Sequence, residues 1–75
     1  MKKHQHTRGS RSLGKRLRQL RKAREWTLQE AADAIGVSKS HVHDMESGRN
    51  TNPTIGLVIA ISRTFRTSID TLVKP

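Results

Sequence analysis

Large apolar residues recur at helical spacing in five separate stretches of the chain, and polar or glycine-containing segments separate these stretches. Within each stretch they return every three or four positions, as on the buried side of an amphipathic helix. No stretch alternates apolar and polar residues in the way that a half-buried strand does. The pattern therefore predicts an all-α fold, a compact five-helix bundle.

The first stretch follows a polar, basic segment, residues 1–11, that has no apolar periodicity. We predict that this segment is a flexible, disordered basic arm and that residues 12–75 form one domain. Ser12 is a suitable N-cap for the first helix. The apolar stripe of that helix then recurs at i, i+4 and i+7, at Leu13, Leu17 and Leu20.

The second and third stretches carry the signals of two helices joined by a tight turn. Thr27 opens the segment TLQEAADAI, and Glu30 three residues later completes a T-x-x-E capping box. Gly36 is suited to end this helix in a left-handed conformation, while Ser38 can cap the next helix and Gly48 can end it. Two helices joined by a short glycine-containing turn predict a helix-turn-helix unit.

The third helix, expected over residues 39–47, has an apolar side on one flank only. Val42 and Met45 form that side. The opposite arc contains side chains with hydrogen-bonding capacity, namely Lys39, Ser40, His43, Asp44 and Ser47. Such a face is either ordinary solvent-exposed surface or a surface that recognises a polar partner.

Two more helices are expected after the loop RNTNP. Thr54 caps the fourth helix, and Leu57 is expected to project from it on a side that the core does not need. A short fifth helix follows Ser68. The expected inner positions of the fourth helix are Ile55, Val58, Ile61, Ser62 and Phe65.

Positive charge is concentrated in the first third of the chain. The formal net charge is +9, and residues 1–24 contain ten of the 15 Lys and Arg and none of the six acids. Residues 25–75 therefore contain five bases and six acids, which gives a net charge of −1. A one-sided field of this kind attracts polyanions, with nucleic acid as the first expected partner and an anionic membrane surface as the second.

Several other classes of function are not supported. The chain of 75 residues has no cysteine, so it has no disulfide and no thiolate metal site, and its core is modest. His41 and His43 lie about 160° apart around a helix axis, so they cannot both coordinate one metal ion. No apolar run approaches the roughly 18 residues of a membrane span. We expect a cytoplasmic protein that is not an enzyme and needs no metal or cofactor.

The segment from WTLQEAADAI to SIDTL resembles the phage repressor/Cro (XRE) family of helix-turn-helix domains. The motifs that carry the resemblance are LGKRLRQLR, the T-x-x-E-A-A start, GVSKS, the M-E-S-G close, NPT and the final SIDTLV, over roughly residues 13–73. The resemblance implies a lambda repressor-like DNA-binding domain whose third helix lies in the DNA major groove.

The resemblance also implies roles for individual residues. Base contacts are expected from Lys39, Ser40, His43 and Asp44. Phosphate contacts are expected from Thr27, Gln29, Arg49, Asn50, Thr51 and Thr54. Arg21 and Glu46 match a structural ion pair. Candidates for subunit contact are Leu57, Thr67, Ile69 and Thr71.

These observations favour a sequence-specific regulator of transcription, a small repressor that binds a palindromic double-stranded DNA operator as a homodimer. An antitoxin or adaptor that mainly holds a protein partner, and binds DNA for autoregulation, is the alternative. A third hypothesis is a non-specific nucleic-acid or RNA binder that uses the basic arm and the first helix.

Overall fold

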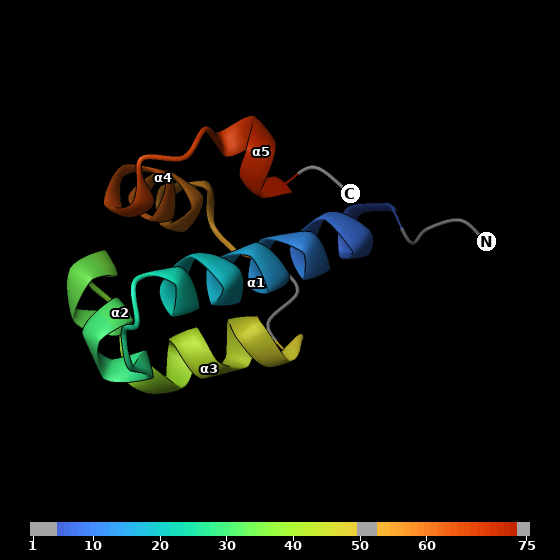
Figure 1. Ribbon diagram of the computed structural model, residues 1–75. Helices are drawn as coiled ribbons and strands as arrows, with labels where there is room; N and C mark the ends of the chain where they lie inside the picture. The colour runs from blue at the N-terminus through green and yellow to red at the C-terminus, as the bar shows by residue number, and fades with distance from the viewer. Residues whose placement is uncertain (1–4, 50–52, 74–75) are drawn as a thin grey trace.

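The structure is a computed structural model that describes residues 5–49 and 53–73. These residues form helices and no strands (Figure 1), which confirms the predicted all-α five-helix fold. The helices are α1 (Gln5–Ala23), α2 (Leu28–Ile35), α3 (Lys39–Ser47), α4 (Ile55–Phe65) and α5 (Ile69–Val73).

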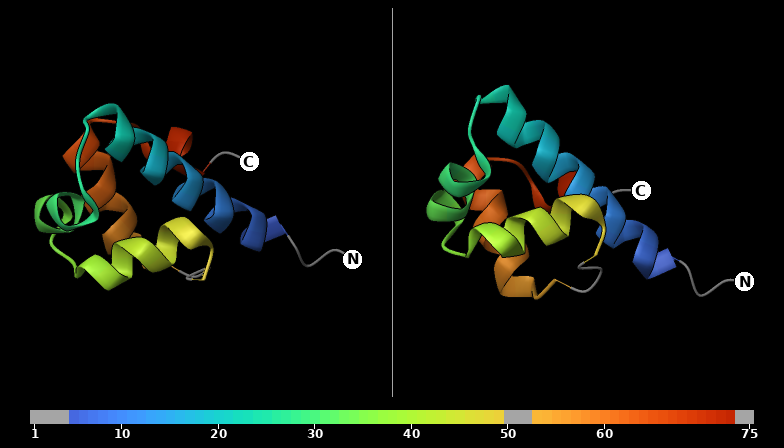
Figure 2. Two further views of the ribbon diagram at one scale, coloured as in Figure 1. Left: turned by 60° about the horizontal axis from the view of Figure 1, so that its bottom comes forward. Right: turned by 90° about the horizontal axis from the view of Figure 1, so that it is seen from below.

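Helix α1 runs through the middle of the molecule and holds the other helices together. It packs against α3 on one side and α5 on the other, while α2 contacts both α3 and α4. Seen from below, α3 crosses in front of α1 and forms the outermost layer of that face (Figure 2). The core between the helices consists of Leu13, Leu17, Ala31, Ala32, Ile35, Val42, Met45, Leu57, Val58, Ile61, Phe65 and Leu72.

The ends of α2 and α3 lie where the sequence predicts them. The Thr27 hydroxyl oxygen accepts from the Glu30 backbone N–H at 3.1 Å, and the Glu30 carboxylate accepts from the Thr27 N–H at 2.7 Å. This reciprocal capping box starts α2. Gly36 and Gly48 end the two helices with φ of 95° and 86°, a left-handed conformation that glycine adopts without steric cost. The Ser38 side chain caps α3 by accepting from the His41 N–H.

Helix α1 starts earlier than the sequence indicates. Its first residue is Gln5, so Ser12 lies inside the helix instead of capping it, and residues 5–11 of the expected arm are helical. Extending an existing helix is inexpensive because each added residue gains a backbone hydrogen bond, and neither propensity nor apolar spacing marks where this extension ends. Residues 1–4 of the expected arm lie outside the described part of the chain.

In the first turn of α4, the residue that faces the core is not the one that the sequence predicts. Leu57, expected to project outward, is 8% exposed and belongs to the core, whereas Ile55, expected inside, is 71% exposed. At 100° per residue, both positions lie roughly 80° from the centre of the stripe formed by Val58, Ile61 and Phe65, on opposite sides of it. Helical periodicity cannot choose between the two, and packing places Leu57 inside.

Helices α1 and α3 approach each other so closely at Gly14 that no side chain fits there. A Cβ atom built on Gly14 would lie 3.0 Å from the Met45 carbonyl carbon, still nearer to its oxygen, and 3.6 Å from the Glu46 Cα. All three neighbouring atoms belong to the α3 backbone, which cannot rotate away as a flexible side chain can. The absence of a side chain at Gly14 therefore sets the distance between α1 and α3.

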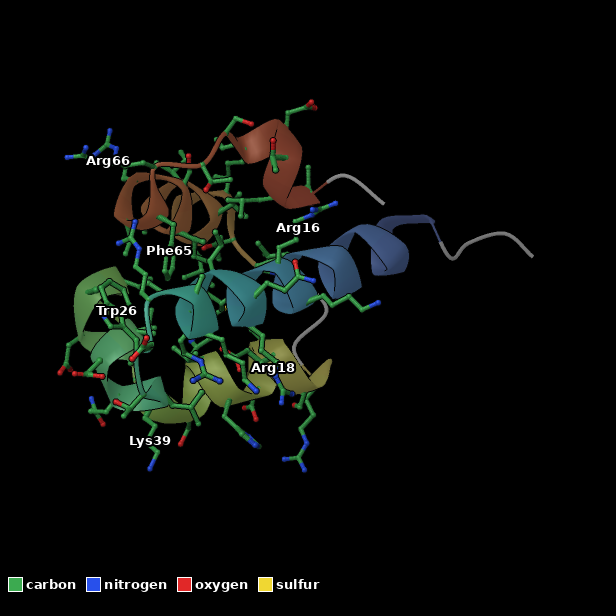
Figure 3. All side chains as sticks on the ribbon, in the orientation of Figure 1. Arg16, Arg18, Trp26, Lys39, Phe65 and Arg66 are labelled. Atoms are coloured by element: carbon green, nitrogen blue, oxygen red, sulfur yellow. The ribbon has the colours of Figure 1, made fainter. Side chains whose placement is uncertain are left out.

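The link between α1 and α2 is closed by side chains that pack against one another. Trp26 is half-buried against the core, with its ring centroid 5.4 Å from that of Phe65 (Figure 3). The Arg24 guanidinium lies 5.1 Å from the Trp26 centroid and 5.0 Å from that of Phe65, within range of a cation–π contact. This arrangement agrees with the packing role that the sequence gives Trp26, and the exposed Arg24 covers the edge of the core.

Gly56, unlike Gly14, has room for a side chain. It lies in the first turn of α4, and a Cβ added there would meet nothing closer than the Thr54 hydroxyl at 3.9 Å. Gly56→Ala is therefore expected to raise the free energy of unfolding by up to about 1 kcal/mol, because alanine loses less backbone entropy in a helix. Urea unfolding at low protein concentration measures the change. A decrease in stability would show that α4 needs glycine flexibility there.

Candidate nucleic-acid interface

The outer face of α3 is polar, basic at its start and open to solvent. Lys39, Ser40 and His43 are exposed and Asp44 is half-buried, while Val42 and Met45 on the other side of the helix are buried in the core. Lys39 extends away from the body of the molecule at the N-terminal end of α3 (Figure 3). The structure thus brings the four predicted base-contacting residues together on one surface.

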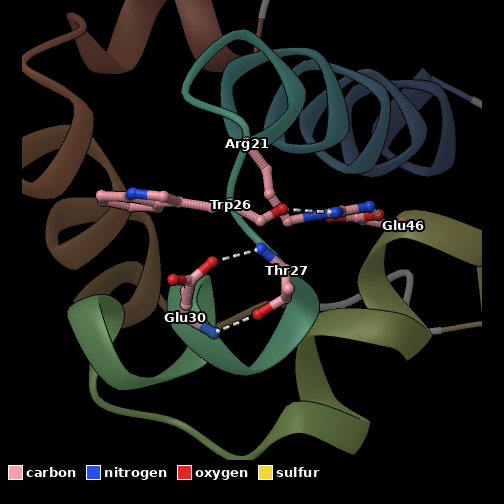
Figure 4. A network of polar contacts seen from close by, with 5 residues as sticks. All are labelled: Arg21, Trp26, Thr27, Glu30 and Glu46. Atoms are coloured by element: carbon pink, nitrogen blue, oxygen red, sulfur yellow. Dashed lines mark hydrogen bonds and ion pairs between the residues drawn. The ribbon is translucent and has the colours of Figure 1, made fainter.

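A partly buried ion pair fixes the C-terminal end of α3 to α1 (Figure 4). Arg21 donates from Nε to Glu46 Oε2 at 2.7 Å and from Nη2 to Oε1 at 2.8 Å, while its Nη1 donates to the Trp26 carbonyl at 2.9 Å. The two side chains are 13% and 6% exposed. The hydrogen bond to Glu46 raises the pKa of the Arg21 guanidinium above its ordinary value, so this end of the pair stays charged. Such bidentate geometry restrains both distance and orientation.

Asp44 organises the exposed side chains near the end of α3. Its Oδ1 lies 3.9 Å from His43 Nδ1 and 3.9 Å from an Arg49 guanidinium nitrogen. The Asp44 carbonyl accepts the Arg49 N–H at 2.9 Å, which places Arg49 directly after the helix. An open hollow of about 500 Å³ lies beside this group, lined by Ser38, Ser40, His41, Asp44 and Arg49. This face of α3 therefore carries both signs of charge beside an open hollow.

The N-terminus of α2 presents two of the predicted phosphate-contacting residues. Thr27 and Gln29 are both exposed. The Gln29 amide donates to the Asp33 carboxylate at 2.9 Å, and the Glu30 carboxylate already occupies the Thr27 N–H. An acid at the first turn uses part of the positive end of the helix dipole. This terminus is therefore less attractive to a phosphate than its position alone indicates.

The N-terminus of α4 has no such acid. The exposed Thr54 caps the helix, its hydroxyl accepting from the Leu57 N–H at 3.1 Å, and the first turn contains no Asp or Glu. The positive end of the α4 dipole is thus uncompensated by a side chain. Asn50 and Thr51, also predicted to contact phosphate, lie outside the described residues.

The residues predicted for subunit contact do not form one exposed surface. Leu57 is part of the core, so the expectation that it projects outward is wrong for the reason given above. Thr67 is half-buried in the turn after α4, where its hydroxyl donates to the Phe65 carbonyl and its carbonyl accepts from Ser62. Ile69 and Thr71 are exposed on α5.

Gly14 is the positioning residue that the sequence reasoning missed. A signal was present, because an isolated glycine inside an otherwise helical pattern usually has a packing reason. At 100° per residue, Gly14 and Arg21 lie about 20° apart on one flank of α1. Both hold α3, one by close backbone contact and the other by the ion pair with Glu46.

Residues 5–49 and 53–73 contain no group of three or more His, Cys, Asp or Glu side chains that could hold a metal ion. Within those same ranges, no helix has the length and apolar character needed to cross a membrane.

Two short helices joined by Gly36, Val37 and Ser38, with the polar face of the second helix exposed, define a helix-turn-helix protein. Sequence comparison agrees with this class, since a family described as helix-turn-helix domain matches residues 12–73. The chain belongs to this helix-turn-helix domain family. The family is not one of enzymes, as expected from the sequence.

Two bacterial regulators are similar to this chain. It is 34% identical over 62 residues to the HTH-type transcriptional regulator SinR of Bacillus licheniformis, and 35% identical over 60 residues to the protein of the same name from Bacillus subtilis (strain 168). The matches cover 83% and 80% of this chain but 56% and 54% of the two relatives. The chain thus spans about half the length of the curated relatives it matches.

Proposed function

We propose that the chain is a sequence-specific regulator of transcription that binds double-stranded DNA through α3. The observation that carries the proposal is the exposed polar face of α3, presented on the outer surface of the molecule and held in place by Gly14 and by the Arg21–Glu46 pair. In helix-turn-helix proteins, the second helix of the unit enters the major groove and its N-terminal residues contact base edges. The similar regulators are named for transcriptional regulation.

Four side chains on this face have the chemistry to read bases. The Lys39 ammonium can donate to guanine O6 or N7, and the Ser40 hydroxyl can donate or accept. The Asp44 carboxylate can accept from cytosine N4. His43 is adjacent to Asp44 and can contact either a base or a phosphate.

Phosphate contacts on both sides of α3 would set its depth and register in the groove. Thr27 and Gln29 at the start of α2 flank one side. For the other side, the candidates are Arg49 and the unopposed N-terminus of α4 at Thr54, together with Asn50 and Thr51. Glu30 weakens phosphate binding at the N-terminus of α2. We therefore expect the residues around the N-terminus of α4 to contribute more of the affinity for DNA.

The proposal includes a homodimer on a palindromic operator. One copy presents one recognition helix, which reads few base pairs, whereas two copies related by a two-fold axis read two half-sites about 34 Å apart. Occupying such an operator would block or recruit polymerase without a cofactor.

Lys39→Ala is expected to weaken binding to the preferred duplex by about 1–3 kcal/mol and to relax base preference at one position. The reason is that Lys39 stands at the first position of α3 with its side chain free to reach a base edge. Fluorescence anisotropy with the preferred duplex and with single-base variants measures both effects.

Lys22→Ala is the matched control, because it removes the same charge from the exposed end of α1. It should weaken preferred and scrambled duplexes by the same factor and reduce the salt slope by about one unit. Equal behaviour of the two variants would mean that Lys39 contributes charge alone and reads no base.

A further inference from the structure

Helix α4 exposes an isoleucine side chain that a protein of this size is expected to bury. Ile55 is 71% exposed, and Ile59, one turn later on the same side of the helix, is 36% exposed. Together they form an apolar ridge over the first two turns of α4. Contiguous exposed apolar surface, unlike scattered single residues, marks sites of contact with another molecule.

Such a hollow lies beside the ridge. It has a volume of about 320 Å³ and lies between the α2–α3 turn and the start of α4. Gly56 and Ala60, one turn apart, keep it open because their side chains are absent or small, and a Cβ at Gly56 would meet nothing closer than 3.9 Å. Its lining is mostly apolar and consists of Ile35, Gly36, Val37, His41, Pro53, Thr54, Gly56, Leu57 and Ala60.

Charge indicates what kind of molecule can dock here. The segment Ile55–Ser62 has no charged residue, although the chain as a whole has a net charge of +9. Ten of the fifteen bases precede Glu25, and residues 25–75 have a net charge of −1. A copy of the chain that approaches through α4 therefore meets little electrostatic repulsion.

We propose that a second copy of this chain docks on α4, with Ile55 of each copy inserted into the hollow of the other. A two-fold interface requires a patch that is complementary to itself, and a ridge next to a hollow on the same two turns meets that requirement. Because two turns of one short helix bury little area, the dimer is weak in solution and is stabilised when both copies occupy adjacent half-sites. The part of this inference that concerns two copies on adjacent half-sites rests on the proposed function.

The hollow also lies next to the polar face of α3. His41 lines both this hollow and the polar hollow beside Asp44 on α3. The proposed interface is therefore adjacent to the proposed DNA-reading face.

The test compares Ile55→Gln with a matched control, Ile69→Gln, which changes an exposed isoleucine on α5 instead. Gly56→Gln is a third variant that fills the hollow and keeps the ridge. Sedimentation equilibrium of the full chain measures self-association, and titration of duplexes with one or two half-sites measures cooperativity. Thermal melting of each variant confirms that it folds.

Ile55→Gln and Gly56→Gln are each expected to weaken self-association at least about tenfold and to weaken two-site binding by a similar factor relative to single-site binding, while Ile69→Gln changes neither. Equal loss in Ile69→Gln, no loss in Ile55→Gln, or a chain that neither self-associates nor binds two sites cooperatively would overturn the inference. If no duplex is preferred but Ile55→Gln still dissociates the dimer, the α4 interface stands and the proposed function fails.

Discussion

Gly14→Ala is expected to lower the free energy of unfolding by at least about 3 kcal/mol, near the upper end of overpacking effects. For a domain of this size that corresponds to a melting temperature lower by roughly 12 °C or more. Glycine to alanine in the middle of a helix ordinarily stabilises. Here the new methyl group would overlap the Met45 carbonyl on α3, so α1 and α3 must separate. Thermal and urea unfolding followed by circular dichroism measure the loss.

The control for this substitution is Gly56→Ala, the same chemical change at a helical site with open space. The two variants should move stability in opposite directions. Where Gly14→Ala still folds, the displaced α3 should also lose specific DNA affinity more than non-specific affinity. A Gly14→Ala protein as stable as the parent would mean that α1 and α3 are not in contact at this point.

Arg21→Met is expected to destabilise the protein by about 3–5 kcal/mol. The reason is that it leaves the Glu46 carboxylate, 6% exposed, without its bidentate partner. It also removes the donor to the Trp26 carbonyl at the link between α1 and α2. Replacing both charged residues removes the unpaired charge, so Arg21→Met/Glu46→Leu should recover most of the loss.

A double-mutant cycle over these two positions measures the coupling energy directly. We expect the double variant to be much more stable than the sum of the two single-variant losses predicts. Additive effects, or a loss below about 1 kcal/mol in Arg21→Met, would show that water replaces the partner and that the pair does not hold α3.

The helix-turn-helix unit could be predicted from sequence almost residue by residue. Each end of α2 and α3 depends on local chemistry that the sequence states directly, with Thr27 and Ser38 as hydroxyl caps and Gly36 and Gly48 in left-handed conformations. The same applies to the polar face of α3, because Val42 and Met45 alone fix which side of the helix is buried.

What could not be predicted depends on packing between helices. The choice between Ile55 and Leu57 is decided by the neighbours of α4, because the two positions are nearly equivalent in the periodic pattern. The role of Gly14 depends on where the Met45 carbonyl lies, and a one-dimensional pattern does not contain that distance. The early start of α1 at Gln5 reflects helix extension beyond the last apolar residue, for which the sequence gives no stop signal.

The most direct test of the central claim is a selection from random duplex DNA, followed by comparison of the selected and scrambled sequences at about 150 mM salt. If α3 reads bases as we propose, a palindromic motif should emerge and be bound about 10³-fold or more tightly than scrambled DNA. Its conserved positions would face Lys39, Ser40 and Asp44. The contradictory result is the absence of any motif, with affinity for every sequence falling equally as salt rises, because binding would then depend on phosphate charge alone.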